Sequence, residues 1–239
     1  MESGGLRRQL LEIIADARER EHEFLALCDD SPSPEPGQWT VKDHLAHLTA
    51  WRINVAQLLD AVRTGTEAPR MDEDVQGSNA RVYAASKDKT AEVVKSNARA
   101  AYERLEAAIS ASSDEDLLKP HPRPRSAGVA VWQTVPGHVH HLAEHLMFWH
   151  LEQGNDEAAE AAQLWVHGLD RAQFPEPKSV ALSTYNLGCF YAHIGREDEA
   201  LLRFKLAFGL DPSLKELAQS DPGLERIRNH PELMALISE

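Results

Sequence analysis

Residues 39–51 read Trp-Thr-Val-Lys-Asp-His-Leu-Ala-His-Leu-Thr-Ala-Trp. Thr40 is a favourable N-cap residue, and Asp43 follows it three positions later as the acidic partner of a capping box. The stretch therefore predicts a helix that runs from Thr40 to about Val62. His44 and His47 fall in the first two turns of this helix.

The chain on either side predicts three more long helices. Residues 6–28 have apolar side chains at helical spacing, and the proline-rich residues 31–37 end that helix. Residues 63–77 are polar and predict a loop that could cover the mouth of a site. A long helix follows, which could be divided into two pieces, and it ends near residues 110–113. After a proline-rich linker at residues 120–124, the last helix opens near residue 134 and ends near Gln153.

Four long helices within the first 153 residues predict a four-helix bundle. Ala, Leu and Glu are prominent in the chain, only 6% of the residues are aromatic, and runs of β-branched residues are few. This composition is typical of an all-α protein.

The last helix of the predicted bundle contains a group of histidines. Residues 137–145 read Gly-His-Val-His-His-Leu-Ala-Glu-His. His138, His141 and His145 are three and four residues apart, so they share one face of the helix, whereas His140 points elsewhere. Two His side chains at positions i and i+4 are a metal-binding arrangement. Together with one His from residues 39–51 they would form a three-imidazole site with coordination positions open for water or substrate.

Residues 181–214 resemble a tetratricopeptide repeat (TPR), a helix-turn-helix unit of about 34 residues. The residues at its characteristic small, aromatic and terminating positions are Leu187, Gly188, Tyr191, Gly195, Ala200, Phe204, Ala207 and Pro212. A weaker copy lies upstream, where Gly154, Ala159 and residues 168–170 align with Gly195, Ala200 and residues 209–211. We therefore expect a bundle domain at residues 1–153 and a TPR-like helical region at residues 154–239, with short helices capping its end.

Charge and cysteine content restrict the function classes. The 25 basic and 38 acidic residues give a formal charge of −13, and we see no local basic patch, so nucleic acid and anionic membranes are not expected partners. No apolar run suggests export or membrane spanning, and a cytoplasmic protein is expected. Cys28 and Cys189 are far apart and have no Cys-x-x-Cys partner, so we expect reduced thiols and no cysteine nucleophile. A metal is then the only credible source of catalytic power.

Over roughly residues 6–153 the chain resembles the DinB-like four-helix bundles, and most closely their ClbS/DfsB branch. The motif Trp-Ser/Thr-x-x-Asp-x-x-x-His-Leu of that superfamily maps its metal-binding His onto His47. The late His-x-x-x-His motif maps onto His141 and His145. The resemblance implies a divalent metal, for which imidazole ligands favour Zn, Ni or Fe. His44 and His138 are alternative ligands by spacing. His138 could instead contact one of the metal-binding side chains without binding the metal itself.

The superfamily includes thiol-dependent S-transferases and isomerases, metal-binding proteins of unknown activity, and ClbS-type proteins that hydrolyse a reactive ring for self-protection. We expect a metal-dependent hydrolase or detoxification enzyme that acts on a small-molecule electrophile. The alternatives are a transferase that uses a low-molecular-weight thiol, and a scaffold that forms a homodimer or binds a protein partner through the TPR region. Asp43 and Glu144 are candidate general bases or orienting groups, although capping and a solvated position are the commoner fates of such residues.

Overall fold

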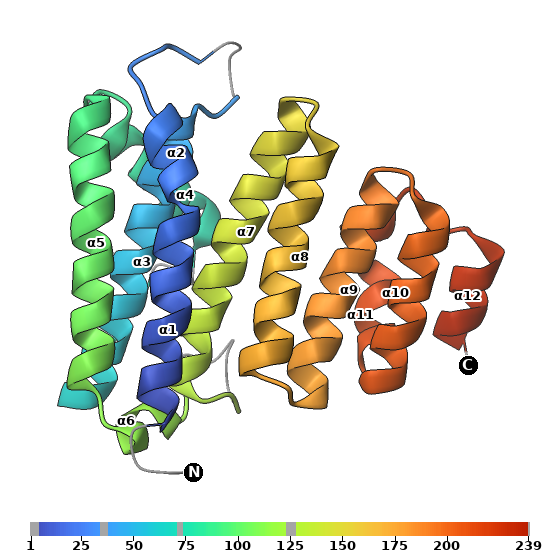
Figure 1. Cartoon of the computed structure of the whole chain (residues 1–239). Helices are drawn as coiled ribbons and strands as arrows, with labels where there is room; N and C mark the ends of the chain where they lie inside the picture. The colour runs from blue at the N-terminus through green and yellow to red at the C-terminus, as the bar shows by residue number, and fades with distance from the viewer. Residues whose placement is uncertain (1–4, 34–37, 71–73, 123–127, 239) are drawn as a thin grey trace. The chain divides into compact units, whose positions relative to one another are not determined.

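The computed structural model describes residues 5–33, 38–70, 74–122 and 128–238. These residues form helices and no strand, which confirms the predicted all-α class (Figure 1). The chain divides into two compact units, Met1–Leu142 and Ala143–Glu239. Within the described residues, no helix combines the length and the apolar content needed to cross a membrane.

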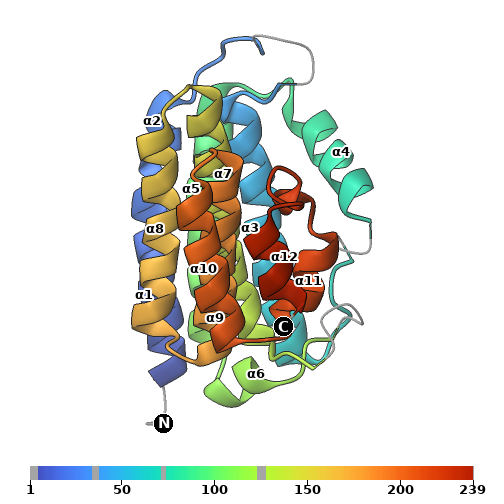
Figure 2. The same ribbon diagram turned by 90° about the vertical axis from the view of Figure 1, so that its right-hand side faces the viewer.

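The first unit is a helical bundle. Its long helices are α1 (Gly5–Arg20), α3 (Val41–Thr64), α5 (Ala91–Ala111) and the first half of α7 (Thr134–Glu152). Its short helices are α2 (His22–Leu27), α4 (Val75–Ser86), α6 (Asp114–Leu118) and the 3-10 turn η3 (Val131–Gln133). Helix α5 packs against both α1 and α3, and α4 lies beside α3 (Figure 2).

The predicted capping box fixes the start of α3. The Thr40 hydroxyl accepts a hydrogen bond from the Asp43 backbone N–H at 3.2 Å, and the Asp43 carboxylate accepts one from the Thr40 backbone N–H at 2.9 Å. At the other end the backbone of Gly65 has a φ of +70°, a left-handed conformation that glycine adopts without steric cost. Helix α3 thus begins where the sequence predicts and ends two residues later than predicted.

The other helices of the first unit differ from prediction in detail. The predicted helix at residues 6–28 is divided into α1 and α2 at Glu21, whose side chain is buried in the core. The two-piece helix after the loop is confirmed as α4 and α5, but α4 already begins at Val75, inside the predicted loop. Residues 71–73 of that loop and residues 123–127, which include the end of the predicted linker, lie outside the described residues.

The second unit continues from α7 through a series of helices. They are α8 (Asp156–Gln173), α9 (Pro177–His193), α10 (Glu197–Leu210), α11 (Leu214–Ser220), the 3-10 turn η4 (Pro222–Leu224) and α12 (Pro231–Ser238). Helices α9 and α10 form a hairpin whose turn contains Gly195 at a φ of +79°. The hairpin occupies most of residues 181–214, and its assignment as a TPR stays a prediction.

The division between the units falls inside α7, before the boundary that the sequence predicts after Gln153. The last turns of α7 account for this position, because Met147 and Leu151 pack against the apolar core of the second unit. Helix α7 itself is unbroken from Thr134 to Glu152. The predicted boundary at residue 153 stays a prediction.

Candidate metal centre

Three of the predicted ligands come together. His47 lies in the second turn of α3, and His141 and His145 lie one turn apart on α7. One ligand nitrogen of each residue can be chosen so that all three lie within 4.8 Å of one another. The Nε2 atoms of His47 and His141 are 3.0 Å apart. This trio is the group of metal-ligating side chains that the described residues offer, and we call it the histidine cluster.

Two imidazoles of the cluster, those of His47 and His141, are held in their neutral form. Burial, together with the neighbouring His141 and His44, lowers the pKa of His47 from 6.5 to about 3. Burial and the positive charge of Arg52 lower the pKa of His141 to about 4. A metal ion binds only the neutral imidazole. At neutral pH both rings are therefore ready to bind an ion without first losing a proton.

The distances and the donor set suit a metal ion. Two nitrogens that each lie about 2.0–2.1 Å from one zinc ion are roughly 3.3 Å apart at the tetrahedral angle. The 3.0 Å separation between His47 and His141 is close to this value. Three imidazoles leave at least one coordination position for water or substrate, which is the arrangement of catalytic rather than structural sites.

The two alternative ligands lie outside the cluster. His44 is buried, and its ring packs against Phe24 and Trp39, at centroid distances of 5.6 Å and 5.3 Å. His138 is also buried, and its Nε2 accepts a hydrogen bond from Arg52 Nε at 3.1 Å. Because an arginine can only donate, the neutral His138 ring carries its proton on Nδ1. His138 therefore belongs to a hydrogen-bond network around Arg52 and not to the histidine cluster.

That network was not foreseen from the sequence. Arg52 is fully buried in α3, and its guanidinium pairs with the Glu21 carboxylate and lies 3.5 Å from the centre of the Tyr102 ring. Tyr102 in turn donates a hydrogen bond to Glu21 at 3.2 Å. A charged residue in the middle of an apolar helix face is the one sequence signal that could have revealed it. Arg52 thus connects the core ion pair to the histidines.

A cavity of about 350 Å³ lies beside His47 and His141. Trp51 from α3 forms one wall and donates a hydrogen bond from Nε1 to Asn79 Oδ1 of α4 at 3.1 Å. Asn54 and His121 also line the cavity, although neither stood out in the sequence. Helix α4 and the segment after α6 therefore line the space next to the histidine cluster.

The two candidate carboxylates differ in their surroundings. Asp43 accepts hydrogen bonds from the backbone N–H and the hydroxyl of Thr40, so it caps α3, and it does not line the 350 Å³ cavity. Glu144 is exposed on α7, between His141 and His145 in sequence. The catalytic roles of both residues stay predictions.

Neither cysteine has the character of a nucleophile. Burial raises the pKa of the Cys28 thiol, and burial together with Asp221 raises that of Cys189 to about 12. Both thiols are therefore protonated at neutral pH, and the thiolate is the reactive form. A thiol taking part in chemistry at the histidine cluster would have to come from a separate molecule.

Comparison with known proteins identifies the first part of the chain. The family model of the DinB superfamily matches residues 7–153. This range runs from the third residue of α1 to just past the end of α7 and contains all three residues of the histidine cluster. No curated protein and no solved structure matches the chain.

Proposed function

The chain belongs to the DinB superfamily, and on that premise we propose that it is a metal-dependent enzyme acting on a small electrophilic molecule. One observation carries the proposal: the Nε2 atoms of His47 and His141 are 3.0 Å apart at the wall of a cavity of about 350 Å³. A cavity of this size is in the range that holds small organic ligands.

In this proposal His47, His141 and His145 hold one divalent ion, which is Zn, Ni or Fe by the preference of imidazole ligands. When bound, such an ion supplies Lewis-acid activation of a nucleophile at neutral pH. Trp51 covers one side of the substrate and limits its contact with water. The amides of Asn54 and Asn79 bind polar groups of the substrate and orient them.

The reaction that we favour is hydrolysis, in keeping with the resemblance to the ClbS/DfsB branch. The oxygen of water forms a bond to an electrophilic ring carbon, the strained bond from that carbon to its leaving atom breaks, and the leaving atom gains a proton. None of the described residues that line the cavity is an Asp or Glu. His121 is therefore our candidate for accepting the proton from water, because it lines the cavity but is not part of the histidine cluster.

The test is a product analysis with the metal-loaded protein. The protein is loaded in turn with Zn, Ni or Fe(II) and mixed with a strained electrophile such as styrene oxide, with and without a low-molecular-weight thiol. We expect a product that has gained one water molecule, formed without thiol and lost in His141→Ala. Product formation only with thiol would favour the transferase alternative. No product under either condition would contradict both reactions.

We also propose that residues 181–214 form a TPR that makes a protein contact. The α9–α10 hairpin supports this assignment, because Gly188 lies against the Phe204 ring as a small residue does where two repeat helices cross. Leu202, Leu206 and Leu210 follow at intervals of four along α10 and are 54%, 48% and 42% exposed. An exposed apolar row of this kind suits a second copy or a protein partner. If no partner uses it, Leu206→Glu will leave the mass of the protein in solution unchanged.

A further inference from the structure

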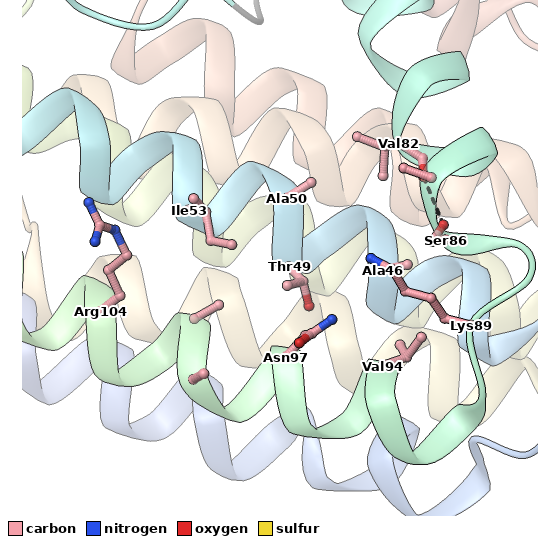
Figure 3. A pocket seen from close by; sticks show the side chains of 13 residues that line it. Ala46, Thr49, Ala50, Ile53, Val82, Ser86, Lys89, Val94, Asn97 and Arg104 are labelled. Atoms are coloured by element: carbon pink, nitrogen blue, oxygen red, sulfur yellow. Dashed lines mark hydrogen bonds between the residues drawn. The ribbon is translucent and has the colours of Figure 1, made fainter.

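A second cavity, separate from the histidine cluster, opens between α3, α4 and α5 (Figure 3). Its volume is about 440 Å³. Most of its wall is apolar and built from small or branched side chains, which include Ala46, Ala50, Ile53, Val82, Val94 and Ala101. An apolar wall with few polar groups is typical of a site for a small organic molecule.

One polar group in this wall has no hydrogen-bond partner among the residues that the structure describes. Thr49 lies in α3 with only 6% of its surface exposed, and its Oγ1 is buried without a hydrogen-bond partner among the described residues. Thr49 lines the cavity, and Figure 3 shows it pointing toward Asn97 of α5. An unpaired buried hydroxyl destabilises a protein, so a ligand that pairs with it compensates for that cost.

A positive charge lines the same cavity. Lys89 lines the cavity, and Figure 3 shows its amine end directed toward the region of Thr49 and Asn97. The nearby Lys87 pairs with Asp88 at 2.9 Å, whereas no carboxylate in the described part of the chain pairs with the Lys89 amine. Arg104 at the other end of the cavity is already paired with Asp60 at 3.6 Å. The unbalanced charge of the cavity is therefore that of Lys89.

We propose that this cavity binds an apolar monocarboxylate, with its carboxylate between Lys89, Thr49 and Asn97. All three side chains can donate a hydrogen bond, and a carboxylate accepts without donating. The apolar part of the ligand lies along Ala50 and Ile53. One lysine balances one negative charge, which favours a carboxylate over a dianionic phosphate ester. The proposal does not depend on a metal in the histidine cluster.

The test is calorimetric titration of the full-length protein with octanoate, and with 1-octanol as the uncharged probe of equal chain length. We expect octanoate to bind and octanol to bind at least about tenfold more weakly, because charge-assisted hydrogen bonds are about twice as strong as neutral ones. Lys89→Met should weaken octanoate binding by a similar factor. Lys87→Met removes a lysine that does not line the cavity and should leave the binding unchanged.

Two further variants separate binding from folding. Ala100 is exposed and lines the cavity, so Ala100→Phe should fill the cavity and abolish binding without disturbing the core. Thr49→Val replaces the unpaired hydroxyl by a methyl group of similar size. It should weaken octanoate binding while the melting temperature of the ligand-free protein stays equal or rises.

The proposal would be overturned by no heat of binding with octanoate, by equal binding of octanoate and octanol, or by octanoate binding that survives Ala100→Phe. A dimer of the unliganded protein that Ala100→Phe dissociates would also overturn it, because the cavity would then be the contact surface of a second copy. Metal content measured on the same samples tests the histidine cluster separately, so the two proposals can fail independently.

Discussion

Arg52 is the residue whose replacement should affect the first unit most strongly. Its guanidinium is fully buried and meets the carboxylate of Glu21 and Nε2 of His138. Arg52→Met leaves the Glu21 charge buried without its partner, so we expect a loss of about 3–5 kcal/mol in the free energy of unfolding. Chemical denaturation of the purified variant measures this loss.

The double variant Glu21→Gln, Arg52→Met serves as the control for this prediction. Because it removes both charges, it should recover part of the lost stability relative to Arg52→Met alone. A double variant that is less stable than the single one would show that the pair is not the reason for the loss.

The buried histidines make the stability of the metal-free protein depend on pH. The pKa values of His47 and His141 are about 3 and about 4 in the folded chain, and that of His44 is also about 4, against 6.5 for an ordinary histidine. Between these values the unfolded chain binds more protons than the folded one, so acid favours unfolding. Stability should be complete above about pH 6.5 and should fall as the pH drops toward about 4.

Denaturation in the presence of a chelator at about pH 7.5 and about pH 5 measures this dependence. His44→Phe removes one of the titrating groups from an aromatic environment and should make the dependence smaller. Equal stability at both pH values would contradict the low pKa values.

At the scale of helices, the crossing of α9 and α10 depends on Gly188. A Cβ atom at this position would lie 2.8 Å from Cε1 of Phe204, whose side chain is fully buried. Gly188→Ala should therefore cost roughly 1–3 kcal/mol of stability. Gly209 in α10 is the matched control, since a Cβ atom there meets nothing within 4 Å. Gly209→Ala should stabilise the helix by roughly 0.5–1 kcal/mol, and thermal melts of both variants test the contrast.

Local sequence rules predicted the helices well where the deciding contacts are local. Thr40 and Asp43 define the start of α3 from four consecutive residues, and the spacing of His141 and His145 follows from the helix alone. The break at Glu21 could not be foreseen, because it places a carboxylate against Arg52 from another helix. Helix α6 is only five residues long and has no helical periodicity to detect.

The candidate site could be predicted only in part for the same reason. His47 was found through its motif, but its separation from His141 depends on how α3 and α7 pack. The choice of His47 over His44, and the pairing of His138 with Arg52, arise from contacts between residues far apart in sequence. Asn54 and His121 line the cavity because of the same long-range packing, and no local sequence pattern identifies them.

At the scale of the whole molecule, the family match covers α1 to α7 and leaves the helices from α8 onward outside it. The second unit has its own apolar core, made mainly from α9 and α10. We expect metal binding at the histidine cluster to stabilise the folded protein. The gain in the free energy of unfolding depends on the ratio of free metal to dissociation constant and is about 2.7 kcal/mol at a hundredfold excess.

The measurement to make first is the metal content of the purified, tag-free protein by inductively coupled plasma mass spectrometry, after exposure to zinc or nickel and removal of free ions. We predict close to one divalent ion per chain, which is lost in His47→Ala and His141→Ala. His140 lies on the same helix but outside the histidine cluster, so His140→Ala should retain the ion. Absence of metal from the native protein, or equal metal in His47→Ala and His140→Ala, would contradict a metal centre at this site.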